Sequence, residues 1–166
     1  MPISLRLAAC LLALCCWGTR AHAAEPACPT LLQHTFPRLQ DEKPQALCQY
    51  SGKVLLVVNT ASYCGFTPQY KGLEALHSRY KDKGLVVLGF PSNDFAQEKA
   101  SNKEIADFCE NTFGVKFPML ARTAVRGKDA NAFYRQLAEK TAGNPCGTST
   151  STWWPGTAAW SATTPA

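Results

Sequence analysis

The chain has 166 residues, the length of one average domain, so we expect a single folded unit. Lysine and arginine outnumber aspartate and glutamate by only 17 to 12, and no long basic run is present. This mild positive charge argues against a nucleic-acid-binding protein.

Residues 1–23 predict an export signal. Arg6 precedes the apolar stretch LAACLLALCCW, and residues 21–23 form the A-x-A pattern of a cleavage site. The stretch is too short and too weakly flanked for a membrane span. A lipoprotein signal ending at Cys10 is an alternative, although it leaves almost no apolar core before the cysteine. We therefore expect an exported, periplasmic protein without a membrane span, whose mature chain has 15 basic and 12 acidic residues.

Five cysteines remain after the signal is removed: Cys28, Cys48, Cys64, Cys109 and Cys146. They form no CxxC motif and no His-spaced pair, so we expect no zinc or other metal site. Cys28 and Cys48 bracket a turn-rich segment and are candidates for a structural disulfide in an oxidising compartment. Spacing alone does not fix this pairing.

The segment 53–70, KVLLVVNTASYCGFTPQY, predicts a strand, a polar loop and a helix. It follows a short strand candidate at residues 36–39. Residues 54–58 are apolar and valine-rich, as in a central strand, whereas Thr67 and Pro68 are suited to the N-cap and first position of a helix. Cys64 would then lie where helix N–H groups and the helix dipole lower the pKa of a thiol and favour the nucleophilic thiolate. The alternative is a buried structural cysteine.

The rest of the chain predicts alternating helices and strands. Helix 68–81 ends before Gly84, and the apolar strand 85–90 completes a parallel strand–helix–strand unit. Because ligand sites form at the carboxyl edge of such sheets, the loop at residues 91–94 should lie near Cys64. His77, on this helix, is interpreted as a surface or packing residue and not a ligand.

Two further helices are expected. Ser101 and Glu104 form a capping box for one that ends at Gly114. After an extended segment at residues 115–120, Asp129 or Asn131 caps a last helix that ends near residue 143.

Three segments together resemble the glutathione peroxidase family in its cysteine form. They are residues 59–67, NTASYCGFT; residues 88–95, LGFPSNDF; and Gln97-Glu98. The resemblance extends over residues 36–143. It implies an α/β protein with a thioredoxin-like fold, a central mixed sheet flanked by helices that is incomplete at the C-terminus, within a domain of residues 24–145.

The resemblance also implies a chemistry. Cys64 corresponds to the peroxidatic residue, which would reduce hydrogen peroxide or organic hydroperoxides and become a sulfenic acid. A thiol donor, glutathione or a thioredoxin-like protein, would then restore it without a cofactor. Gln97 matches a glutamine that donates a hydrogen bond near the sulfur, although Ser92, Asp94 and Lys99 depart from the family pattern. Cys109 is a possible resolving thiol, but it lies one position from the plant-type location, which favours a structural role.

The family continues with a W-N-F-x-K segment and a strand, whereas residues 146–166 form an aberrant, uncharged tail. Residues 146–157 have the sequence CGTSTSTWWPGT. If the codons that encode them are read in a frame that starts at their third base, they can encode WNFNKYLVARD, which matches the missing family segment. The hypothesis is that the reading frame slipped near Pro145. The chain as written would lack a strand and leave a sheet edge exposed, so we expect it to be poorly stable and weakly active or inactive. Trp153 and Trp154 are not candidates for catalysis because Pro155 follows them.

Two other interpretations remain open. A periplasmic thiol–disulfide oxidoreductase would also place a cysteine between a strand and a helix, but Thr67 occupies the position where C-x-x-C chemistry needs a second cysteine. A non-catalytic remnant of a peroxidase would form no sulfenic acid at Cys64. The segment between Pro118 and the last helix is short and lacks the insertion that tetrameric members of the family carry. In this it resembles the monomeric members, so we expect a monomer.

Overall fold

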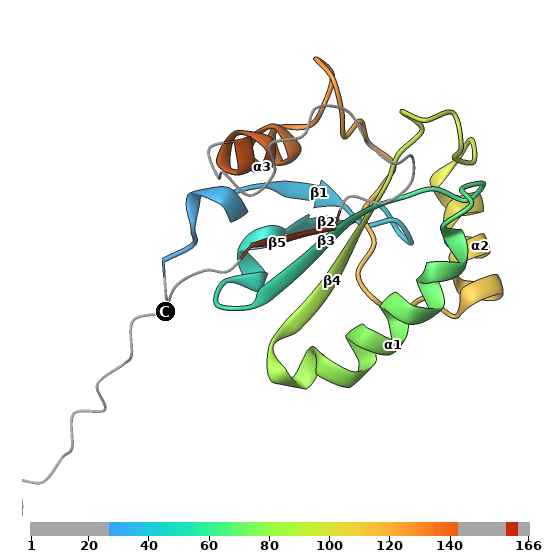
Figure 1. The fold of residues 1–166 in the computed structure, drawn as a ribbon, viewed down its shortest axis with the longest axis horizontal. Coiled ribbons are helices and arrows are strands. Elements are labelled where there is room, and N and C mark those ends of the chain that lie inside the picture. Colours follow the sequence, from blue (N-terminus) through green and yellow to red (C-terminus); the bar gives the residue numbers. More distant parts are fainter. Residues whose placement is uncertain (1–26, 143–158, 163–166) are drawn as a thin grey trace, which may run out of the picture.

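The computed structural model describes residues 27–142 and 159–162 (Figure 1). Its helices and strands follow one another as β1 (Thr35–Pro37), β2 (Pro44–Ala46), β3 (Val54–Thr60), α1 (Tyr70–Tyr80), β4 (Leu85–Pro91), α2 (Asn102–Phe113), α3 (Ala132–Ala142) and β5 (Ala159–Ala162). Short 3₁₀ turns cover Thr30–Leu32, Leu47–Tyr50, Thr67–Gln69 and Lys81–Lys83. Within these described residues, no helix is long and apolar enough to cross a bilayer.

Strand β3 lies at the centre of a mixed sheet in the order β4-β3-β5. It pairs in parallel with β4 from Val54↔Leu85 to Thr60↔Pro91, which confirms the expected strand–helix–strand unit. The strand is two residues longer than predicted, because Asn59 and Thr60 continue the pairing. A β1–β2 hairpin adjoins this sheet through residues 119–120. Leu120 forms a bridge with Arg38, next to β1, and Met119 forms a bridge with Gly89 of β4.

The edge of β3 is covered over Leu55–Val58, so the expectation of an exposed edge is wrong over this part of the strand. Strand β5, from within the uncharged tail, pairs antiparallel with Leu55–Val58 in the register Leu55↔Ala162 to Val58↔Ala159. An unpaired strand edge is a template for any extended segment, and this part of the tail satisfies its backbone groups. The rest of the tail, including residues 146–157, lies outside the described residues.

Helices cover both faces of the sheet (Figure 1). On one face, Phe90 and Leu88 of β4 pack with Phe133 and Leu137 of α3. On the other face, Val87 packs with residues of α1 and α2, among them Tyr70, Ile105 and Cys109. Strands buried on both faces read as continuous apolar runs, which is why β3 and β4 could be located from sequence.

Within the described residues, helix ends follow the sequence signals at four of the five predicted positions, and the end predicted near residue 143 lies outside those residues. Ser101 and Glu104 form the complete capping box of α2. Gly84 and Gly114 end their helical segments with φ of 90° and 64°, the left-handed region that suits glycine. Asn131, not Asp129, caps α3, since its Oδ1 accepts the N–H of Tyr134 at 3.0 Å.

The start of α1 differs from the prediction. The chain first makes the 3₁₀ turn Thr67–Gln69, and α1 begins only at Tyr70. Thr67 is not an N-cap, because its hydroxyl group lies against the carbonyl oxygens of Ala61 and Cys64 and not against a helix N–H. Thr67 therefore ties the loop before the helix to the helix start.

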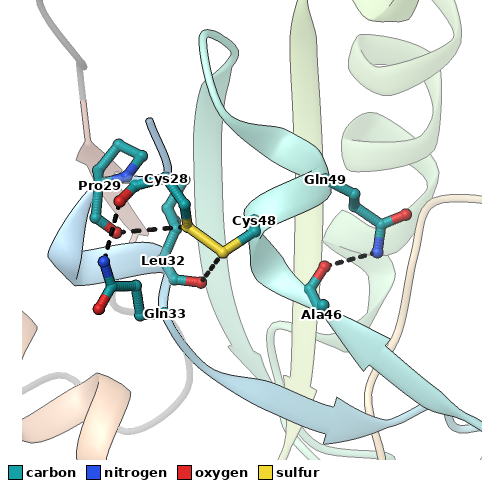
Figure 2. The surroundings of a disulfide bond; sticks show 7 residues. All are labelled: Cys28, Pro29, Leu32, Gln33, Ala46, Cys48 and Gln49. Atoms are coloured by element: carbon teal, nitrogen blue, oxygen red, sulfur yellow. Dashed lines mark hydrogen bonds between the residues drawn. A yellow bond between two sulfur atoms is a disulfide. The ribbon is translucent and has the colours of Figure 1, made fainter. Parts of the chain in front are cut away.

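A disulfide between Cys28 and Cys48 confirms the expected pairing. Figure 2 shows it joining the segment before β1 to the turn after β2. The same N-terminal segment places Leu32 in the core and lets His34 Nε2 contact Gln136 Oε1 of α3 at 3.2 Å. The disulfide thus fastens the N-terminal segment to the face of the sheet that α3 covers.

Candidate active site

Cys64 lies in the loop that joins the carboxyl end of β3 to the first turn of the following helix. It takes part in no disulfide, and its residue is 9% exposed. The N–H of Thr67 donates to the Cys64 carbonyl at 3.0 Å. The Thr67 hydroxyl shares its hydrogen between Ala61 O at 2.8 Å and Cys64 O at 2.7 Å. The loop is therefore a tight, internally bonded turn that carries a single thiol.

A second loop, residues 92–99, lies against the Cys64 loop. Ser92 follows β4, and its N–H donates to Thr60 O at 3.0 Å, which ties the ends of both parallel strands together. Two residues of this loop, Gln97 and Glu98, reach the Cys64 loop through hydrogen bonds. The prediction that residues after the two strands meet at one sheet edge is confirmed.

Gln97 is adjacent to the cysteine loop. Its carbonyl oxygen accepts the N–H of Tyr63, the residue before Cys64, at 2.9 Å. Its side-chain Oε1 is buried, and no group within the described part of the chain hydrogen-bonds to it. Buried amide oxygens normally have a partner, so this position favours interaction with a group brought in by a ligand or solvent. The hydrogen-bonding role of Gln97 stays a prediction.

Glu98 is also a member of the site, although no separate role was predicted for it. It is 8% exposed, and its Oε1 accepts N–H groups from Ser62 at 3.1 Å and Lys99 at 2.8 Å. Burial raises the pKa of the Glu98 carboxyl, while these N–H donors act in the opposite direction. Only its position directly after Gln97 marked it in the sequence, and an acid that is buried cannot be told from an exposed one by composition.

Cys109 lies in the core and not at the loop. It projects from α2 into the apolar cluster with Tyr70 and Ile105 and is 3% exposed. Burial raises the pKa of its thiol to about 12, with a smaller contribution from the negative charge of Glu98. A thiol held protonated in an apolar environment is a poor nucleophile, which favours the structural interpretation of Cys109.

The outer face of the Cys64 loop carries an exposed aromatic ring. Tyr63 is 64% exposed, and Lys99 Nζ donates to its hydroxyl at 2.9 Å while lying 4.7 Å from the ring centroid. The same ammonium group lies 5.2 Å from the ring centroid of Phe108 on α2. A cation over two aromatic rings forms the rim beside the cysteine.

His77 is packed against the neighbouring strand β4. Its Nδ1 accepts the N–H of Val87 at 3.3 Å, and burial lowers the pKa of the imidazole. No group of three metal-ligating side chains occurs among the residues with described positions. Trp153 and Trp154 lie outside those positions.

The glutathione peroxidase family model matches residues 33–138. The chain is 53% identical over 102 residues to the glutathione peroxidase-like peroxiredoxin gpx1 of Schizosaccharomyces pombe, covering 61% of this chain and 65% of that protein. It is 49% identical over 104 residues to the hydroperoxy fatty acid reductase gpx1 of Synechocystis, covering 62% of each. The glutathione peroxidase of Lactococcus lactis is also 49% identical, over 62% of this chain and 66% of that protein. The chain thus spans just under two thirds of the length of each of these relatives.

Solved structures agree with the fold. The crystal structure of Trgpx in apo form has a TM-score of 0.50 and 37% identity, covering 67% of this chain and 64% of that one. That of T. cruzi GPX1 has a TM-score of 0.52 and 30% identity, covering 75% and 74%. The expected thioredoxin-like α/β fold is confirmed by these matches and by the mixed sheet between two helical layers.

Proposed function

Because the chain belongs to the glutathione peroxidase family, we propose that it is a thiol-dependent peroxidase whose peroxidatic residue is Cys64. Its substrates are hydrogen peroxide or organic hydroperoxides, and its role is the response to oxidative stress. The observation that carries the proposal is the position of this thiol at the carboxyl edge of β3, in a turn bonded to the Gln97 loop.

The first step is an attack of the Cys64 thiolate on the terminal oxygen of the hydroperoxide. A sulfur–oxygen bond forms, the oxygen–oxygen bond breaks, and the leaving alkoxide or hydroxide takes a proton to become an alcohol or water. Cys64 is oxidised to the sulfenic acid. The Gln97 side chain, whose Oε1 is buried beside the loop, is assigned to donate a hydrogen bond from its amide nitrogen to the thiolate or the leaving oxygen.

A thiol donor completes the cycle. The donor thiolate attacks the sulfenic sulfur, water leaves, and a mixed disulfide forms; a second donor thiol then releases Cys64 and an oxidised donor. Glutathione and a thioredoxin-like protein both satisfy this chemistry. Cys109 does not serve as the resolving thiol in this scheme, since it is buried in the core with a raised thiol pKa.

We propose that the protein acts after export, in the periplasm, as a monomer. The signal-like residues 1–23 support export, and a disulfide between Cys28 and Cys48 is typical of proteins in oxidising compartments. The frame slip near Pro145 stays a hypothesis as well. Resequencing the gene tests it, since an intact frame that encodes residues 146–157 as written would refute it.

The experiment that tests the function measures peroxide-dependent oxidation of glutathione and of a thioredoxin, using this chain and a version with the frame restored. The proposal predicts peroxide-dependent turnover that Cys64→Ser abolishes and Cys109→Ala leaves in place. Insulin reduction without peroxide would instead indicate a thiol–disulfide oxidoreductase. A frame-restored protein that consumes no peroxide with either donor would refute the proposal.

A further inference from the structure

We propose that Glu98 is a positioning residue, whose buried carboxylate holds the Cys64 loop in the geometry that its reaction with peroxide requires. The inference rests on the proposed function and deepens it. Glu98 acts on the sulfur through the backbone of Ser62, two residues before the cysteine.

The contact between the two loops has two adjacent points. Ser62 donates its N–H to Glu98 Oε1 at 3.1 Å, and the next residue, Tyr63, donates its N–H to the carbonyl oxygen of Gln97 at 2.9 Å. Two successive residues of one loop thus bond to two successive residues of the other. One hydrogen bond would leave the loop able to pivot, whereas two neighbouring bonds fix both its position and its direction just before Cys64.

Glu98 is itself held from the strand end. Its N–H donates to Asn93 Oδ1 at 3.1 Å, and its Oε1 also accepts the N–H of Lys99 at 2.8 Å. Ser92, the residue before Asn93, donates its N–H to Thr60 O at 3.0 Å. A closed set of hydrogen bonds therefore runs from the end of β3 through the second loop and back to the cysteine loop.

A carboxylate in this position has a cost that packing alone does not explain. Glu98 is 8% exposed, and its Oε2 has no hydrogen-bond partner among the residues the structure describes. Burying an ionisable group is unfavourable, and the pKa of the Glu98 carboxyl is raised by burial although Arg122 acts in the opposite direction; a residue that only filled space could be apolar. Costly buried groups concentrate at functional sites, where geometry is maintained at the expense of stability.

The chain offers a matched control in Glu74. Its Oε2 also accepts two backbone N–H groups, those of Lys116 at 2.7 Å and Phe117 at 3.0 Å, but it connects α1 to the segment before residue 118. Glu74→Ala and Glu98→Ala therefore each remove an acceptor of two backbone N–H groups, and only the second removes an acceptor from the cysteine loop, that of the Ser62 N–H. Glu98→Gln keeps an oxygen that can accept the same two N–H groups.

The test measures two rates at Cys64 in the folded full-length chain: sulfenic acid formation with hydrogen peroxide, and alkylation by iodoacetamide. Because small displacements of a reacting group can be costly, Glu98→Ala should slow both reactions by about tenfold or more. Glu98→Gln should stay within about threefold of the unchanged protein, and Glu74→Ala within about twofold, because the acceptor is kept or its loss is remote.

The inference is overturned if Glu98→Ala slows the reactions no more than Glu74→Ala, or if Glu98→Gln slows them as much as Glu98→Ala. Should Glu98→Ala fail to fold, Asn93→Ala decides instead: it removes the acceptor of the Glu98 N–H from an exposed position, and unchanged rates would overturn the inference. Failure of the proposed function gives a different result from failure of this inference. If the function is wrong, Cys64 of the protein without substitutions reacts with iodoacetamide but not with peroxide.

Discussion

Loss of the Cys28–Cys48 disulfide should reduce the stability of the fold by a predictable amount. The two cysteines are separated by 20 positions in the sequence. A cross-link that closes a loop of this length restricts the unfolded chain and so adds about 3 kcal/mol to the free energy of unfolding. For a domain of this size that loss corresponds to a fall of roughly 10 °C in Tm. The segment that it fastens carries Leu32 and His34, so contacts with α3 should weaken first.

The assay compares urea unfolding of the unchanged chain with that of the Cys28→Ser/Cys48→Ser double variant, each with and without dithiothreitol. Dithiothreitol should destabilise the unchanged chain to the level of the double variant and should not affect the double variant. This comparison controls for effects of the reductant on Cys64 and Cys109. A change in unfolding free energy below about 1 kcal/mol would refute the reasoning, because the loop-closure effect would then be missing.

Three further predictions concern buried or capping groups. Because its thiol pKa is raised to about 12, Cys109 should resist iodoacetamide at pH 8 while Cys64 reacts, and equal labelling by mass spectrometry would contradict this. Burial lowers the pKa of His77 in the folded protein, so the unfolded chain binds a proton at a higher pH than the folded chain does. The free energy of unfolding should therefore fall as the pH drops through about 6.5, the pKa of histidine in the unfolded chain. His77→Gln should flatten this dependence in urea titrations at pH 5 to 7, and an unaltered slope would count against it. Ser101→Ala should cost about 1 kcal/mol of unfolding free energy by removing the cap of α2, and Ser101→Asp should restore most of it; two equal losses would exclude the capping role.

Periodicity and capping patterns were sufficient to locate most of the fold. The apolar runs of β3 and β4 predicted a parallel pair because strands buried on both faces lack polar alternation. The Ser101 capping box and the glycines at residues 84 and 114 predicted helix ends because few other residues satisfy those backbone conformations.

The errors occurred where tertiary contacts override local preference. Thr67 has the residue type of an N-cap, but the loop folds back so that its hydroxyl group bonds to Ala61 and Cys64 carbonyls instead. Strand β5 was not expected because its pairing with β3 joins residues more than 100 positions apart, and no local pattern encodes such a contact.

The candidate site was predicted in part. Cys64 and Gln97 could be named because each belongs to a motif, and the structure brings their loops together through the Tyr63–Gln97 hydrogen bond. Glu98 received no role because burial of an acid depends on how two distant loops meet. A structural role for Cys109 was favoured because it lies one position from the plant-type location, and the structure places it in the core.

The most direct test of the account is to treat the chain and its frame-restored version with one equivalent of hydrogen peroxide and to trap sulfenic acids with dimedone. Mass spectrometry should find the adduct at Cys64, in the frame-restored protein above all, and should find none at Cys109. A folded, frame-restored protein in which Cys64 carries no adduct, and in which peroxide is not consumed, would contradict the assignment of Cys64 as the peroxidatic residue.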